Sequence, residues 1–304
     1  MLLRKNIPVK YIFGKIKVEL IVITLYAIAV AIEHTWLSLS TSSLPLGVPM
    51  IMGTVISLLL GFRSNQAYDR WWEARTIWGA IVNDSRTLAR QIKTLSKEAY
   101  QGEESFFFKQ RFIKRQIAWC YSLSRTLRNQ EPTHGLEKYL VKRDFQYLGN
   151  YTNVPMAILE LHGNDIQQAM ENGWMNAYQQ VEIDKTLTRL TDAMGKCERI
   201  KNTIFPATYS LYIHLSLIVF FMLLPFSMIE VFGVVLFIPA LIAIASVFFL
   251  IEKMAIHLQD PFENKPTDTP MTAICATIER DLKQCLNETT SASTANQTKV
   301  FYLL

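Results

Sequence analysis

Apolar residues gather in four long runs along the chain. A helix needs about 20 apolar residues to cross the hydrocarbon core of a bilayer. Runs close to that length extend over residues 20–39, 44–62, 202–229 and 231–251. Glu33 and His34 lie within the first run and should sit near one membrane interface. Pro225 and Gly233, on either side of Glu230, should break the chain between the third and fourth helices. The pattern predicts four membrane-spanning helices.

Between the second and third runs, residues 63–202 show a different pattern, in which apolar positions recur every three or four residues. This period is clearest over residues 71–95, 104–127 and 185–200, and it is typical of amphipathic helices. Asn153 followed by Pro155 predicts a helix start, since asparagine caps helices and proline fits their first turn. We therefore predict an all-α membrane protein with a large helical region outside the bilayer.

The basic residues predict the orientation of the chain. Residues 1–17 hold five Lys or Arg, residues 63–202 hold 21 and residues 252–304 hold five, which accounts for all 31. By the positive-inside rule, these three segments and both termini are cytoplasmic. The predicted domains are residues 1–62 with spans one and two, a cytoplasmic region 63–202, spans three and four over 203–251, and a cytoplasmic segment 252–304.

Composition removes several classes of protein. Half of the residues are hydrophobic and 19% are charged, which excludes a disordered chain. The cysteines form no C-x-x-C pair, the histidines are scattered, and no nucleotide-binding, metalloprotease or hydrolase motif occurs. We predict no catalytic residue, no metal site, no cofactor and no nucleic-acid partner.

The second run carries no charge and two parallel stripes of residues four apart. The first stripe consists of small residues, Gly53, Ser57 and Gly61. Small residues let a neighbouring helix approach closely, so this stripe is a candidate packing face. Thr54, Leu58 and Phe62 form the second stripe, which could face a lumen, or could simply face lipid or a protein core.

Three motifs in this sequence resemble the landmarks of bacterial bestrophins, in the same order along the chain. They are Gly61-Phe62-Arg63-Ser64-Asn65-Gln66-Ala67-Tyr68-Asp69-Arg70-Trp71-Trp72-Glu73-Ala74-Arg75 with Trp78-Gly79, then Gly195-Lys196-Cys197-Glu198-Arg199-Ile200 leading to Pro206, and Asp260-Pro261-Phe262-Glu263. The resemblance implies a homopentameric ion channel in the inner membrane, with helices arranged around a central pore.

The resemblance also implies roles for particular residues. Three rings four residues apart form the neck of the pore in this family, and they match Thr54, Leu58 and Phe62. A second constriction near the cytoplasmic exit matches Tyr178, although Met175 or Gln179 would serve after a small shift.

The motif residues Arg70, Trp71, Trp72 and Glu73 should lie just below the membrane. The tryptophans there are either part of the conduction path or an interfacial belt.

Two departures from the family pattern change the expected behaviour. Thr54 stands where an aliphatic residue is usual, so the outer ring should be wetter. After Pro261-Phe262, the next six residues include only Glu263 and Asp268 as acids, with Lys265 between them, and calcium prefers several carboxylates. We predict that calcium does not gate this protein.

The sequence slightly favours anions as the permeant ions. The neck lacks fixed charge, so selectivity would come from ring size, the Thr54 hydroxyl, oriented dipoles and the positive edges of the Phe62 rings. Residues 63–202 hold 21 basic and 16 acidic residues, which favours anions as well. The predicted partners are monovalent ions, lipid and other copies of the chain. A cation channel and a membrane-anchored scaffold that binds a partner or ligand remain the alternatives.

Overall fold

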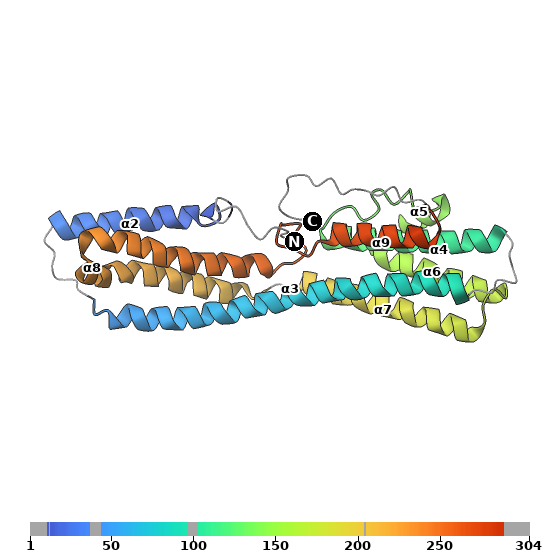
Figure 1. Ribbon diagram of the computed structural model, residues 1–304, viewed down its shortest axis with the longest axis horizontal. Coiled ribbons are helices and arrows are strands. Elements are labelled where there is room, and N and C mark those ends of the chain that lie inside the picture. Colours follow the sequence, from blue (N-terminus) through green and yellow to red (C-terminus); the bar gives the residue numbers. More distant parts are fainter. Residues whose placement is uncertain (1–10, 12, 37–43, 96–102, 204, 289–304) are drawn as a thin grey trace. The chain divides into compact units, whose positions relative to one another are not determined.

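The computed structural model describes residues 11, 13–36, 44–95, 103–203 and 205–288, and every element in these ranges is a helix (Figure 1). The chain divides into two compact units. The apolar unit comprises the described residues up to Trp71 together with residues 205–260, and the charged unit comprises Trp72–Thr203 with residues 261–288. Helix α3 (Gly47–Leu95) is continuous and contributes to both units.

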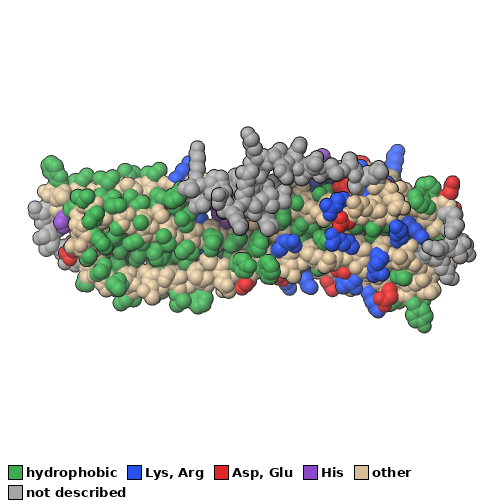
Figure 2. Space-filling view, in the orientation of Figure 1, with side chains coloured by type: hydrophobic (Ala, Val, Ile, Leu, Met, Phe, Trp, Pro, Cys, Tyr) green, Lys and Arg blue, Asp and Glu red, His purple; other side chains and the backbone are tan. Residues whose placement is uncertain are grey.

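The apolar unit consists of α2 (Lys17–Trp36), the first part of α3 and α8 (Ala207–Leu258). Helix α2 packs along α8, and the Tyr26 hydroxyl donates to the Met222 carbonyl at 2.8 Å. Hydrophobic side chains cover most of the visible surface of this unit (Figure 2). Such a surface is stable in lipid rather than in water.

Helix α8 folds back on itself at Gly233. This glycine has φ 70° and ψ 166°, a conformation that residues with a Cβ avoid. The two arms then pack against each other, with the Phe221 and Phe249 ring centroids 5.3 Å apart. The break lies at Gly233, which is one of the two residues predicted to cause it. Pro225, predicted to help break the helix, lies inside the first arm, and the third apolar segment begins at Ala207 rather than Asn202.

Three of the described helices, α2, α3 and α8, are long and apolar enough to cross a membrane. Helix α2 covers most of the first predicted run, and residues 37–39 of that run lie outside the described part. The chain is all-α, as predicted, and the fold-back of α8 gives four apolar arms in total.

The charged unit contains the second part of α3 and five further helices. These are α4 (Glu103–Leu127), α5 (Lys142–Leu148), α6 (Val154–Glu171), α7 (Ala177–Asn202) and α9 (Met271–Cys285). Helix α4 lies against α6 and α9, and α6 also packs on α7. The indole rings of Trp78 and Trp119 are fully buried in the core between them. Burial of such large apolar surface is the main force that stabilises this unit.

Local sequence explains where two of these helices begin. The Asn153 side chain accepts a hydrogen bond from the Met156 amide, with Pro155 in the first turn, which confirms the predicted start of α6. Helix α7 begins with a capping box, in which the side chains of Asn176 and Gln179 each accept a backbone N–H of the other. Both caps satisfy amide groups that a helix end would otherwise leave unpaired.

The boundaries of the units differ from the predicted domains. The apolar unit extends along α3 to Trp71, beyond the predicted limit at Phe62. The predicted C-terminal segment 252–304 contributes to both units: residues 252–258 complete α8, and residues 261–288 pack with the charged unit. Its last residues, 289–304, lie outside the described part.

Candidate functional site

Helix α3 buries one face and exposes another within the apolar unit. The buried positions are three or four residues apart, namely Ile56, Leu60, Arg63 and Ala67. Leu58 and Phe62 lie on the opposite side and keep 58% and 56% of their surface exposed, and Thr54 is exposed as well. The chain by itself therefore neither buries these three residues in its own core nor covers them with another helix.

The Thr54 hydroxyl is already engaged within α3. It donates to the Met50 carbonyl at 2.9 Å, one turn earlier in the helix. Its single hydrogen is therefore not available to an anion, and the hydroxyl offers only acceptor lone pairs. In this rotamer Thr54 cannot donate its hydroxyl hydrogen to an approaching anion.

The small-residue stripe has different surroundings at each position. A Cβ built on Gly53 would lie 3.3 Å from the Phe220 ring of α8, whereas one on Gly61 would meet nothing within 4 Å. The Ser57 hydroxyl donates to the Thr54 carbonyl and is exposed. Gly53 allows α8 to approach α3 closely within one chain, and Gly61 has room for a neighbour that this chain does not supply.

The motif that contains Arg70, Trp71, Trp72 and Glu73 is joined to the second motif in the charged unit. The Arg199 guanidinium pairs with the Glu73 carboxylate at 2.6 Å, although both side chains are partly exposed. Trp72 keeps 54% of its surface exposed. The neighbouring Glu198 accepts a hydrogen bond from the Asn153 side chain at 3.1 Å, so the second motif also holds the start of α6.

Tyr178, the candidate for the second constriction, stands at the start of α7 and is 85% exposed. Of the two alternatives, Met175 is buried in the core of the charged unit, and the Gln179 side chain is bound to the Asn176 backbone. Neither is as free to project into a passage as Tyr178.

A buried ionic cluster in the apolar unit was missed in the sequence. Arg63 and Glu252 are almost completely buried, with a guanidinium nitrogen and a carboxylate oxygen 4.0 Å apart. His214 Nδ1 lies 3.0 Å from the same Glu252 oxygen, and Lys253 pairs with Glu19 at 2.6 Å. Arg63 and Glu252 both lie just beyond the predicted apolar runs, and α8 continues past Ile251 to include Glu252.

The signal for this cluster was present but weak. Arg63 directly follows the second apolar run, and Glu252 directly follows the fourth. Charges of opposite sign at the same end of two adjacent spans can pair, and a buried charge without a partner would be costly. The positive-inside rule counts only basic residues, so it gives no information about the acidic residue Glu252.

The segment after Pro261-Phe262 is folded around its own residues. Phe262 is buried, and Asp268 accepts a hydrogen bond from the Lys265 amide at 3.0 Å. Burial raises the pKa of Asp268, although that hydrogen bond acts in the opposite direction. Glu263 pairs with the Lys265 ammonium. Within the described residues, no group of three or more His, Cys, Asp or Glu could hold a metal ion.

Comparison with known proteins places this geometry in a family. The family described as "Bacterial/Fungal Bestrophin protein" matches residues 7–284. A relative from Nostoc, named a voltage-dependent anion channel-forming protein, is 32% identical, covering 89% of this chain and 87% of its own. The voltage-dependent anion channel-forming protein YneE of Escherichia coli is 31% identical, with 91% and 88% covered.

A solved structure agrees with the sequence relatives. The crystal structure of a bacterial bestrophin homologue from Klebsiella pneumoniae matches with a TM-score of 0.84 and 28% identity, covering 91% of this chain and all of that chain. The relatives are named for forming channels rather than for a reaction, which confirms the prediction that the chain is not an enzyme. The chain belongs to the bestrophin family, among its bacterial and fungal members.

Proposed function

We propose that several copies of this chain, five by family resemblance, surround one axis and form a channel that conducts small anions across the inner membrane. The observation that carries this proposal is the uncharged stripe of Thr54, Leu58 and Phe62, which one chain leaves exposed on α3. In an oligomer, each of these residues would form one ring of an apolar neck. Tyr178 would form a second constriction at the cytoplasmic exit.

The proposed topology uses α2, α3 and the two arms of α8 as four spans. Both termini and the charged unit would then be cytoplasmic, since all Lys and Arg lie in residues 1–17, 63–202 and 252–304. The apolar surface of α2, α3 and α8 supports a place in lipid (Figure 2).

Two features support anions as the permeant species. The positive edges of the Phe62 rings would face the axis, in a stretch that carries no carboxylate. The excess of basic over acidic residues in segment 63–202 would attract anions to the cytoplasmic entrance. The names of the relatives in Nostoc and Escherichia coli agree with this choice.

One observation favours cations as the second candidate. Asp69 follows Phe62 by seven residues, about two helical turns, and therefore lies near the same face of α3. It is exposed, and Asn65 donates to its carboxylate at 3.3 Å without neutralising its charge. A ring of such carboxylates below the neck would attract cations.

The neck is tested by chloride efflux from liposomes that contain the purified protein. Leu58→Ala and Phe62→Ala should each raise the flux severalfold, because a wider apolar ring is easier to wet. Val55→Ala is the matched control, since Val55 is also an exposed apolar residue of α3 but lies beside the stripe. Flux should be unchanged in this control.

The size of the oligomer is checked in the same preparations by native mass spectrometry. An intact oligomer that passes no ion would contradict the channel and favour the scaffold. If the oligomer is intact and neither Leu58→Ala nor Phe62→Ala changes the chloride flux, the constriction lies elsewhere in the protein.

A further inference from the structure

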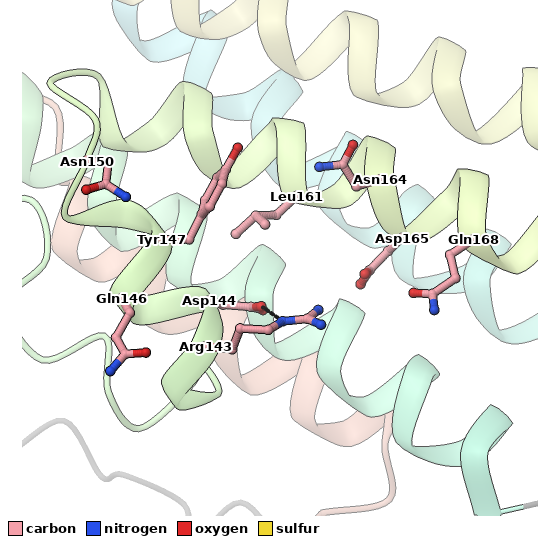
Figure 3. A pocket seen from close by; sticks show the side chains of 9 residues that line it. All are labelled: Arg143, Asp144, Gln146, Tyr147, Asn150, Leu161, Asn164, Asp165 and Gln168. Carbon is pink, nitrogen blue, oxygen red and sulfur yellow. Dashed lines mark ion pairs between the residues drawn. The ribbon is translucent and has the colours of Figure 1, made fainter.

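A polar cavity of about 410 Å³ lies in the charged unit between α5 and α6 (Figure 3). Its lining consists of Arg143, Asp144, Gln146, Tyr147, Asn150, Leu161, Asn164, Asp165 and Gln168. None of these residues belongs to the candidate pore face of α3. The volume lies within the range of small-molecule sites in proteins.

The floor of the cavity is held rigidly by buried ion pairs. Arg115, which is fully buried, donates to Asp165 at 2.6 Å and also pairs with Asp144. Arg111 donates to the other oxygen of Asp165 at 2.9 Å. A buried arginine that pairs with two carboxylates fixes both in position, because breaking either pair would leave an uncompensated charge.

One oxygen on this floor has no hydrogen bond. Asp144 Oδ2 accepts from Arg115, whereas Asp144 Oδ1 is buried and accepts no hydrogen bond within the described residues. Arg143 Nε lies 3.8 Å from this oxygen, which is beyond hydrogen-bond distance. Buried carboxylate oxygens are rarely left in this state, so a donor from outside the chain is the simplest explanation.

Arg143 can make room for that donor. Its side chain is 77% exposed, and among the described residues its one ion pair is the long contact with Asp144. In Figure 3 the guanidinium extends over the space between the two helices, toward Asp165. A guanidinium in this place can bind an anionic group of a ligand, and its movement would uncover Asp144 Oδ1.

The remaining lining sets the chemistry of the ligand. The positive charges of Arg111, Arg115 and Arg143 exceed the negative charges of Asp144 and Asp165 by one. The floor therefore has a net positive charge, and the preferred ligand is anionic overall. Four of the lining residues carry carboxamides, namely Gln146, Asn150, Asn164 and Gln168. Carboxamides both donate and accept, which suits a molecule with several hydroxyl groups.

We propose that this cavity binds a small polyhydroxylated anion of the sugar-phosphate class. A ligand hydroxyl donates to Asp144 Oδ1, the phosphate accepts from Arg143, and the other hydroxyls exchange hydrogen bonds with the carboxamides. A bare anion would meet the unpaired carboxylate oxygen, and a metal ion would be repelled by the Arg143 guanidinium. The site acts independently of ion conduction.

Calorimetric titration of the full-length protein in detergent tests this site, with D-glucose 6-phosphate, D-glucose and inorganic phosphate as probes. Glucose 6-phosphate should bind more tightly than either glucose or phosphate. Arg143→Gln should weaken its binding about tenfold, the loss of one charge-assisted hydrogen bond. Asn164→Ala should weaken the binding of glucose 6-phosphate but leave any binding of phosphate unchanged.

Lys142→Gln is the matched control, because Lys142 is an exposed neighbour of Arg143 in α5 that does not line the cavity. It removes the same charge and should leave binding unchanged. If Arg143→Gln and Lys142→Gln lost the same affinity for glucose 6-phosphate, the loss of any nearby positive charge would explain the effect. That result would overturn the proposal. Phosphate binding as tight as that of glucose 6-phosphate would overturn the sugar assignment, and absence of binding by all three probes would overturn the site.

Discussion

His162 is a buried residue whose protonation the fold opposes. Its ring is fully buried in the charged unit, with its centroid 4.1 Å from that of the tilted Phe112 ring, and neither nitrogen has a hydrogen-bond partner within the described part of the chain. Burial, together with the nearby Arg115 cation, lowers the pKa of His162 well below its ordinary value. The imidazole is therefore neutral in the folded protein at neutral pH.

This environment predicts a pH-dependent stability. As pH falls below about 6.5, the unfolded chain takes up a proton on His162 that the folded chain refuses, so folding weakens with decreasing pH. Between neutral pH and about pH 5.5, one unit below the ordinary histidine pKa, this effect should lower the free energy of unfolding of the wild-type protein by about 1.4 kcal/mol. The His162→Leu variant should lack this decrease. Melting temperatures at about pH 7.5 and about pH 5.5 measure the difference.

His134 provides the control, because it is exposed in the same unit. His134→Leu should keep the pH dependence of the wild-type protein. If His162→Leu retained the wild-type dependence as well, the buried imidazole would not be its source.

Single residues were predictable where the signal is local. Asn153 was identified as a helix cap because its role depends on the next three residues. The pairs of Arg115 with Asp144 and Asp165 join positions 29 and 50 residues apart, and no local pattern in the sequence indicates them. Arg63 and Glu252 carry only a weak signal, since each directly follows an apolar run, and they meet only after α8 has folded back toward α3.

At the level of elements, the fold-back of α8 depends on one glycine. Gly233 has a positive φ with extended ψ, a region that is essentially restricted to glycine. Gly233→Ala should destabilise the protein by roughly 1–3 kcal/mol, the usual cost of such a backbone conformation. Gly163→Ala is the control, since Gly163 lies in the regular helix α6 with open space around its Cα.

The measurement is the melting temperature of the purified protein in detergent. Gly163→Ala should be neutral or stabilising by up to about 1 kcal/mol, because alanine favours helices. A Gly233→Ala variant as stable as Gly163→Ala would show that the turn does not require glycine.

Hydrophobic periodicity predicted the presence of the helices more reliably than it predicted where each helix begins and ends. Length and apolar content located α2, α3 and α8, and of the two residues predicted to break α8, Gly233 marks the turn whereas Pro225 does not. Pro225 lies inside the first arm of α8, and proline is tolerated within membrane helices because neighbouring groups can satisfy the carbonyl that its missing N–H leaves free. Position 233 is decided instead by backbone conformation, which only glycine permits.

For the whole molecule, the sequence predicts the helical membrane architecture but not the assembly. One chain places Leu58, Phe62 and Tyr178 on its own surface, and in the proposed channel a pore would form only when several copies bring these residues together. The motifs from Gly61 to Arg75 and from Gly195 to Ile200 identified the family, and Glu73 and Arg199 now join them by an ion pair. The sugar-phosphate cavity had no sequence motif, because its lining comes from two helices and the loop between them.

The most direct test of the proposed function is the reversal potential of the purified protein in a planar bilayer with asymmetric potassium chloride. We predict a shift toward the equilibrium potential of chloride, because the neck lacks carboxylates and the Phe62 edges are positive. A shift toward the equilibrium potential of potassium would contradict anion selectivity and indicate that the Asp69 carboxylates determine which ion permeates. Absence of current from an intact oligomer would contradict the channel itself.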